Sequence, residues 1–204
     1  MVISDKFIWL HLGKTGGDFT HYLFQKHLSE HLLHIDSISQ PSKHIHLASV
    51  NIKYPEYNVL EKDLILNFRK LPSWIISNNR HKIRAKNIKD AKILSNIVIW
   101  SNMGFVYMHD EQDISNFNSW IKPDDVFHHY TQDKYPKFFI RTEYLVEDFN
   151  KIISHYIPKI KINDNTKPMN VNRDTVNFRI EKSNMKDIYS ANPVWTAVEN
   201  KLYS

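Results

Sequence analysis

The chain has 204 residues, of which 42% are hydrophobic and 24% are charged, as expected for one globular domain with a sizeable core. It contains no cysteine, which excludes disulfides, thiolate metal sites and cysteine nucleophiles. The formal net charge of +5 favours an anionic partner, but does not choose among nucleic acid, nucleotide and acidic glycan.

Targeting and membrane signals are missing from the sequence. No apolar window reaches the roughly 18 residues that a membrane span needs, and Asp5 and Lys6 precede the first apolar run, unlike a secretory signal peptide. We therefore expect a soluble, cytoplasmic protein that folds as a single domain over residues 1–204.

The first predicted elements are a strand, a glycine-rich turn and a helix. Residues 7–12 (FIWLHL) form a short apolar run suited to a buried strand. Residues 13–18 (GKTGGD) break this run with three of the chain's four glycines. Apolar residues then recur at roughly helical spacing from Phe19 to Leu33. Asp18 is the expected N-cap, because its carboxylate can accept hydrogen bonds from the free amides of the first turn.

Strands and helices alternate along the rest of the chain, with polar segments at 35–55 and 164–175. The expected strands are 63–68 and 138–141, and the expected helices are a segment that ends at Arg80, 89–102, 145–156 and a last helix after Asn192-Pro193. This alternation predicts an α/β fold around a mostly parallel sheet flanked by helices.

The glycine turn is a candidate anion site. A strand that runs through a glycine-rich turn into a helix presents backbone amides at the helix N-terminus, which favour phosphate or sulfate. Lys14 adds a positive charge, and Gly16 and Gly17 leave the backbone open to an anion. The ATP-type pattern GxxxxGK[ST] is not met, because Ile8 stands where its first glycine would be. A plain turn with an incidental lysine is the alternative.

The segment FIWLHLGKTGGDFTHYLF resembles the phosphosulfate-binding loop of sulfotransferases, above all the carbohydrate type, whose pattern is roughly F-x-H-x-x-K-T-G-G-T-S. These enzymes use 3′-phosphoadenosine 5′-phosphosulfate (PAPS) as donor and have a P-loop-like three-layer α/β fold. The resemblance implies that Lys14, Thr15, Gly16 and Gly17 hold the 5′-phosphosulfate. Asp18 stands in this binding segment where the family has Thr or Ser. The missing hydroxyl would have to be replaced by Thr20 or by the turn amides alone.

A second segment, DLILNFRKLPSWIISNNR, resembles the family's 3′-phosphate segment, a strand that ends in R-[ND]-P-x-x-R-x-x-S. Arg69 and Ser77 have the family's spacing of eight residues, and an arginine at a strand end can make a forked contact to phosphate. Pro72 is displaced by one position, and Trp74 replaces the second arginine. Arg69 as a surface ion-pair partner and Ser77 as a solvated helix residue remain the alternatives.

A third segment, residues 139–149 (FIRTEYLVEDF), is similar to the family's R-x-E-x-L-x-x-D-F segment, to which we assign a structural role in capping and ion pairing. Residues 105–136 match no segment of the family that we can name.

The chemistry would require a base for an acceptor hydroxyl, and histidine is the usual choice near neutral pH. By resemblance to uronyl 2-O-sulfotransferases, which have an H-x-H pair at a comparable place, His46 is the expected base and His44 is expected to line the acceptor site. Glu56 and Glu61 are reserve bases, and two exposed loop histidines are the alternative. Lys14 would also be catalytic, by stabilising charge on the bridging oxygen.

The sequence therefore favours a PAPS-dependent sulfotransferase that acts, without a metal, on a hydroxyl of a carbohydrate or glycolipid. A small-molecule kinase with a degenerate P-loop is the alternative, although Asp63 begins its strand and is no convincing magnesium ligand. A basic nucleic-acid-binding module is weaker still, because the lysines are spread along the chain and no recognition motif is present. The acceptor and the oligomeric state are left open.

Overall fold

The computed structural model describes residues 1–39, 41–107, 120–162 and 178–204. The expected polar loop at 164–175 lies outside the described residues. The chain divides into two compact units. The first holds Met1–Arg69 and the described chain from His129 to Ile162, and the second holds the described chain of 70–128 and 178–204.

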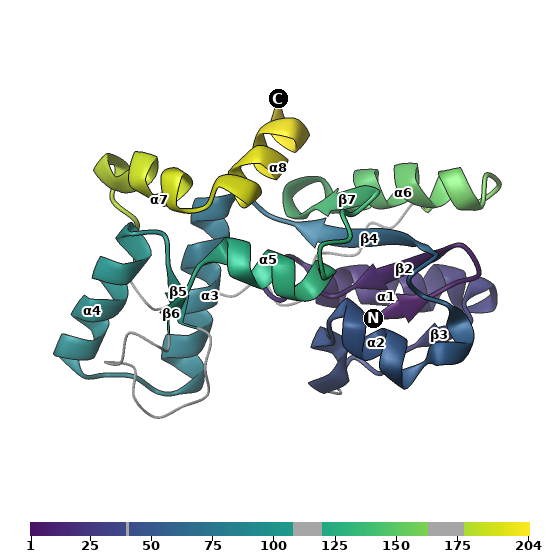
Figure 1. Ribbon diagram of the computed structural model, residues 1–204, viewed down its shortest axis with the longest axis horizontal. Coiled ribbons are helices and arrows are strands. Elements are labelled where there is room, and N and C mark those ends of the chain that lie inside the picture. The colour runs from purple at the N-terminus through teal and green to yellow at the C-terminus, as the bar shows by residue number, and fades with distance from the viewer. Residues whose placement is uncertain (40, 108–119, 163–177) are drawn as a thin grey trace. The chain divides into compact units, whose positions relative to one another are not determined.

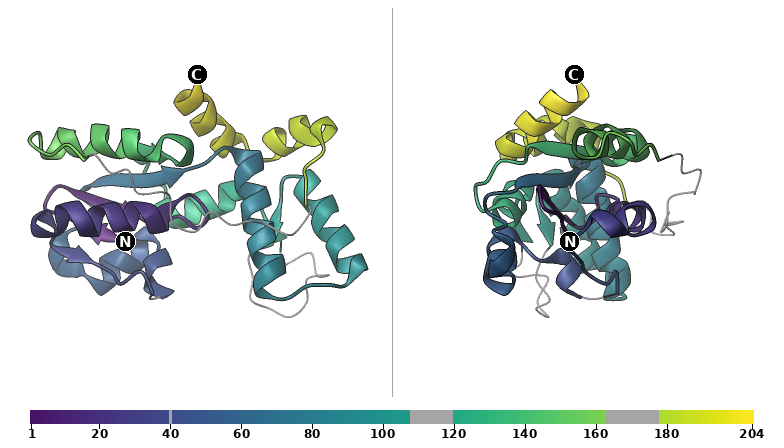
Figure 2. Two further views of the ribbon diagram at one scale, coloured as in Figure 1. Left: turned by 180° about the vertical axis from the view of Figure 1, so that it is seen from behind. Right: turned by 90° about the vertical axis from the view of Figure 1, so that its right-hand side faces the viewer.

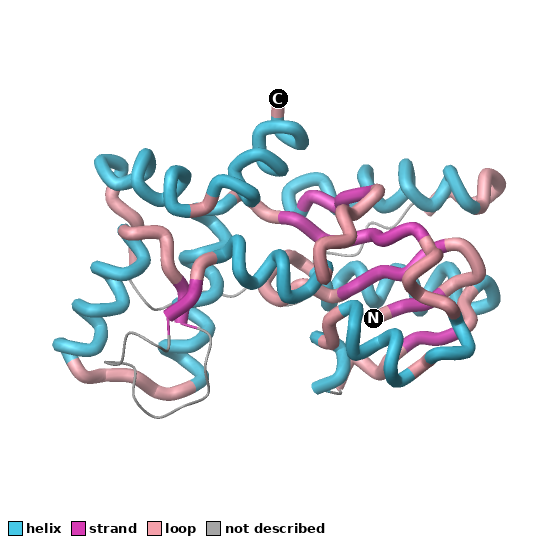
Figure 3. The backbone as a smooth tube through the Cα atoms, viewed as in Figure 1, coloured by secondary structure: helices cyan, strands magenta, loops and turns pink. Residues whose placement is uncertain are grey.

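The first unit is built on a mixed five-stranded sheet (Figure 1 and Figure 3). Its strands have the order β3-β1-β2-β4-β7. Their bounds are β1 Val2–Ile3, β2 Phe7–Leu10, β3 His34–Ile35, β4 Asp63–Phe68 and β7 Phe138–Arg141. The three longest strands, β2, β4 and β7, run parallel, whereas β1 pairs antiparallel with both β2 and β3. The predicted parallel core is thus confirmed.

Helices cover both faces of this sheet (Figure 2). The long ones are α1 Gly17–Leu28, α2 Leu47–Lys53 and α6 Leu145–Tyr156. Because side chains alternate across a strand, Trp9, Ile65 and Ile140 share one face of the sheet and pack with apolar residues of α1 and α6. Helix α2 lies on the other side. Short 3₁₀ helices, η1 Ser29–His31, η2 Pro41–His44, η3 Pro55–Tyr57 and η5 Thr142–Tyr144, connect the elements.

The second unit is mainly helical. It contains α3 Leu71–Ala85, α4 Ala91–Asn102, the antiparallel pair β5 Val106–Tyr107 and β6 Trp120–Ile121, most of α5 Pro123–Thr131, η6 Lys182–Asn184, α7 Met185–Ala191 and α8 Pro193–Tyr203. Its core includes the contact between Trp74 and Trp195, whose ring centroids lie 4.7 Å apart. The carboxylate of Glu199 accepts a 2.6 Å hydrogen bond from the N–H of Leu71, at the start of α3.

Most of the predicted longer elements are present, and β4 and β7 have the predicted bounds. Helix α1 is shorter than its apolar pattern suggests, because the chain passes into η1 at Ser29. Pro193 occupies the first turn of α8, as predicted. Among the described residues, no helix combines the length and the apolar character needed to cross a membrane.

Candidate functional site

The candidate site is the loop that joins β2 to α1. Two of its residues have left-handed backbone, Lys14 with a φ of 66° and Gly16 with a φ of 83°. This conformation is uncommon for a residue with a side chain, so the loop keeps Lys14 in it at some energetic cost. A Cβ on Gly16 would also lie 2.9 Å from Cδ1 of Leu145. The turn leads the chain into the first turn of α1, where the N–H groups of Phe19 and Thr20 donate to the carbonyl oxygen of Gly16 at 3.1 and 3.2 Å.

Parallel pairing brings Arg69 to this loop. Leu10 pairs with Leu66, so β2 and β4 end at the same edge of the sheet, and the loop and Arg69 follow directly. The half-buried guanidinium of Arg69 donates a 3.3 Å hydrogen bond from Nη1 to the carbonyl oxygen of Lys14. The structure therefore brings together the first predicted anchor and the arginine of the second.

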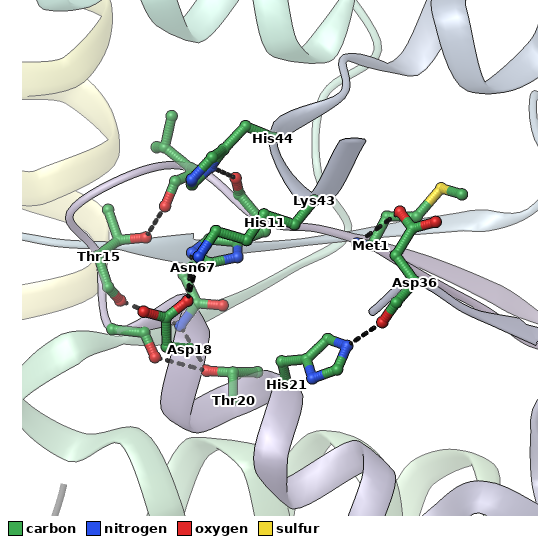
Figure 4. Close-up of polar contacts among 12 residues, drawn as sticks. Met1, His11, Thr15, Asp18, Thr20, His21, Asp36, Lys43, His44 and Asn67 are labelled. Atoms are coloured by element: carbon green, nitrogen blue, oxygen red, sulfur yellow. Dashed lines mark hydrogen bonds and ion pairs between the residues drawn. The ribbon is translucent and has the colours of Figure 1, made fainter. Parts of the chain in front are cut away.

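A buried asparagine of β4 holds the loop in place by hydrogen bonds. Asn67, fully buried in β4, donates from Nδ2 to the carbonyl oxygen of Thr15 (3.1 Å) and to the hydroxyl of Thr20 (2.8 Å), as Figure 4 illustrates. Its Oδ1 accepts a 2.6 Å bond from the indole N–H of Trp9. Every polar atom of this amide group is thus used to tie β2, the loop and α1 to β4.

A third segment fixes the loop from the side of β7. The hydroxyl of Thr142 lies 2.9 Å from the carbonyl oxygens of both Thr15 and Phe68. Residues 139–149, to which Thr142 belongs, also form the ion pair expected of this segment. Arg141 makes a forked contact to Asp148 with distances of 2.8 and 2.7 Å.

The hydroxyls of Thr15 and Thr20 are engaged inside the protein. Thr15 donates to the carbonyl oxygen of Leu12 at 2.6 Å, and Thr20 accepts from Asn67 while lying 3.4 Å from the carbonyl oxygen of Gly16. Both threonines are fully buried. The expectation that the Thr20 hydroxyl replaces the family's missing one is therefore wrong for this conformation, which leaves that role to the backbone amides.

Asp18 is not the N-cap that the sequence predicts. Gly16 occupies that position, and no side chain caps it. Asp18 lies in the first turn of α1, where its carboxylate accepts a 2.9 Å ion pair from Lys43. An acid in the first turn interacts favourably with the helix dipole, and Lys43 offsets its charge. Figure 4 shows this pair beside the loop.

His11 fills the space next to Gly17. Its ring stacks on Trp9, with centroids 5.6 Å apart, and only 4% of its side chain is exposed. A Cβ on Gly17 would lie 2.0 Å from Cδ2 of His11, so the open side of this glycine belongs to the histidine and not to an anion. Nδ1 of His11 has no hydrogen-bond partner within the described chain. Burial lowers the pKa of His11 to about 2, so the ring is neutral.

The two histidines of the H-x-H pair have different surroundings. His44 donates from Nδ1 to the carbonyl oxygen of His11 (3.1 Å), and its ring lies against Gly13. His46 is the N-cap of α2 and contacts Ser49 through both ring nitrogens, with His129 packed on it at 4.3 Å between centroids. Burial lowers the pKa of both histidines, and the neighbouring His129 lowers that of His46 further.

The other predicted site residues are on other elements. Ser77 is half-buried on α3 and belongs to the second unit, whereas Arg69 is the last residue of the first segment of the first unit. Glu56 and Glu61 precede β4 and so lie at the end of the sheet opposite to the loop, where they line a cavity of about 700 Å³ together with Asp63. This position contradicts their role as reserve bases, because the parallel strands separate them from the loop.

Sequence reasoning missed His11 as a packing residue of the loop, and Lys43, Asn67 and Thr142 as its supports. Asn67 leaves a signal that could have been used, since it is the one polar residue within the apolar run 64–68. Lys43 and Thr142 leave none, because only the tertiary fold brings them to the loop.

Comparisons with protein-family models, with curated proteins and with solved structures give no match for this chain.

Proposed function

We propose that the protein is a PAPS-dependent sulfotransferase with a P-loop-like fold, and that its acceptor is a hydroxyl of a carbohydrate or glycolipid. The observation that supports this most is the hydrogen bond from Arg69 to the carbonyl of Lys14. Lys14 and Arg69, 55 positions apart and each predicted from the sequence to contact a phosphate, lie side by side.

The donor's two anionic ends would have different partners. The amides at the start of α1 and the ammonium of Lys14 suit the 5′-phosphosulfate, since a helix N-terminus favours an anion. The guanidinium of Arg69 suits the 3′-phosphate, which it can contact with two N–H groups. Gly16 is required here for its left-handed backbone, since a Cβ at this position would meet Leu145 rather than the anion.

The proposed reaction transfers a sulfuryl group. The acceptor oxygen forms a bond to sulfur while the bond from sulfur to the bridging phosphate oxygen breaks. The electron pair of that bond stays on the phosphate of adenosine 3′,5′-bisphosphate, and the acceptor proton moves to a base of the protein. Lys14 would stabilise the charge that develops on the bridging oxygen.

Isothermal titration calorimetry with adenosine 3′,5′-bisphosphate tests this function. We expect it to bind at least 10-fold more tightly than AMP, because a forked arginine–phosphate contact contributes more than an ordinary hydrogen bond, about 1.5–3 kcal/mol. Arg69→Gln should remove this difference while leaving AMP binding unchanged. Arg84→Gln, on the exposed side of α3, is the matched control.

Two results would reject the proposal. One is equal affinity of the wild-type protein for the bisphosphate and for AMP. The other is tighter binding of magnesium ATP than of the bisphosphate, which would favour the kinase. Binding of DNA or RNA with a steep salt dependence and without nucleotide affinity would favour a nucleic-acid module.

A further inference from the structure

His44 lies against the loop, and within the described chain its Nε2 makes no hydrogen bond. Its Nδ1 lies 3.1 Å from the carbonyl oxygen of His11, and a carbonyl can only accept, so Nδ1 carries the proton. In the neutral ring, Nε2 then has an unused lone pair. Cε1 and Nδ1 lie 3.7 and 3.8 Å from where a Cβ of Gly13 would be, so the ring lies against the loop through its Nδ1–Cε1 edge, and Nε2 is next to that edge.

His46 has no such lone pair available. Nδ1 accepts a long bond from the N–H of Ser49 (3.4 Å), which requires Nδ1 to be unprotonated. Nε2 therefore carries the proton and donates it to the hydroxyl of Ser49 at 2.8 Å. Nδ1 caps α2 and Nε2 binds the hydroxyl of Ser49, so both ring nitrogens of His46 are engaged in this conformation.

The surroundings of His44 suit a base. The residue is solvent-exposed, so an acceptor can reach it, although its ring is partly desolvated against His11. That desolvation, together with Lys43, lowers its pKa, while Asp18 and the carbonyl of His11 act in the opposite direction. The ring is thus neutral near pH 7, as a general base must be.

We propose that His44, and not His46, is the general base of the sulfuryl transfer, an inference that rests on the proposed function. Nε2 of His44 takes the proton of the acceptor hydroxyl as the oxygen bonds to sulfur. The bisphosphate leaves with the electron pair of the broken sulfur–oxygen bond. His44 then releases the proton to solvent.

Matched asparagine variants separate the two histidines. In His44→Asn, the amide can still donate to the carbonyl of His11 but offers no basic nitrogen. In His46→Asn, the amide oxygen can still accept from the N–H of Ser49, and asparagine is a favoured N-cap. We expect His44→Asn to lower turnover about 100-fold or more, in the range of a lost general base, with bisphosphate affinity nearly unchanged. His46→Asn should keep most of its turnover.

Turnover is measured as release of bisphosphate from PAPS, with para-nitrophenyl galactoside, para-nitrophenyl glucuronide and water as probe acceptors. Long-range ¹H–¹⁵N correlation spectra report the tautomers without any acceptor. The expected result is a protonated Nδ1 in His44 and a protonated Nε2 in His46.

The inference is overturned by the reversed tautomers, or by a loss of turnover in His46→Asn as large as in His44→Asn. A failure of the proposed function itself is distinguishable, because the wild-type protein would then not prefer the bisphosphate over AMP.

Discussion

Asp18 places a negative charge beside the amides that we propose bind the donor. Its carboxylate is held by Lys43 at 2.9 Å and lies in the first turn of α1. The same charge stabilises the helix and repels an incoming anion. The charge of Asp18 is therefore expected to raise the stability of the protein and to lower its affinity for the donor.

Asp18→Asn should change stability and donor affinity in opposite directions. The variant loses the favourable interaction with the helix dipole, so we expect the free energy of unfolding to fall by about 0.3–1 kcal/mol. It also loses the repulsion and frees Lys43, so calorimetry should show a few-fold tighter binding of the bisphosphate.

Asp187→Asn, in the exposed first turn of α7, is the control, since it removes a similar helix charge far from the loop in the sequence. Weaker binding by Asp18→Asn than by the wild-type protein would mean that Asp18 does not oppose the anion.

At the scale of elements, a tight contact between His11 and Gly17 packs the end of β2 against the start of α1. The ring of His11 occupies the position where a side chain at Gly17 would begin. This glycine does not need left-handed backbone in the way that Gly16 does. Glycine is required at position 17 because a side chain there would clash with the ring of His11.

Gly17→Ala should therefore destabilise the protein by about 1–3 kcal/mol, the usual effect of overpacking a core. Gly13→Ala is the matched control, because its Cβ would lie 3.7 Å from the nearest atom of His44, an ordinary contact. Urea unfolding measures both variants. A second substitution, His11→Ala, should restore part of the loss in Gly17→Ala, and independent effects of the two changes would contradict this packing.

The sequence predicts well those elements that bury a continuous apolar pattern. β4 and α6 are examples, since five of the six residues of β4 are buried and Pro158 lies just beyond the end of α6. The two-residue strands β1 and β3 were missed, because so short a run has no period. Helix α2 was missed as well, since it lies in the segment 35–55 that is polar overall.

The candidate site was only partly predictable for a related reason. Glycines and a lysine at fixed spacing mark the loop, and a strand-final arginine marks the second contact. The protonation of His44 and His46 depends instead on acceptors and donors that the fold supplies, a carbonyl at position 11 and the amide of Ser49. No spacing in the sequence distinguishes these two histidines.

At the scale of the whole molecule, buried neutral histidines make stability depend on pH. The pKa of His11 is about 2 in the folded protein, against about 6.5 for an ordinary histidine, and burial also lowers the pKa of His21. Between these values the unfolded chain binds more protons than the folded one. Stability contributed by the neutral ring is thus present above pH 6.5 and falls as the pH is lowered.

We expect His11→Leu to weaken this dependence. One buried histidine contributes a slope of about 1.4 kcal/mol per pH unit below its unfolded pKa. Urea unfolding at pH 7, 6 and 5 should therefore show a smaller loss in the variant than in the wild-type protein. His128→Leu, at an exposed position on α5, controls for the added leucine. Equal losses in the wild-type protein and in His11→Leu would disprove the assignment.

The parallel pairing of β2 and β4 places Lys14 beside Arg69. Lys14 and Arg69 belong to neither a common turn nor a common helix, and the ladder from Phe7 to Leu10 against Asp63 to Leu66 makes them neighbours. A nucleotide that binds both residues would stabilise the pairing of β2 with β4. Amide hydrogen exchange should then be slower along both strands, far from the loop, when the nucleotide is bound.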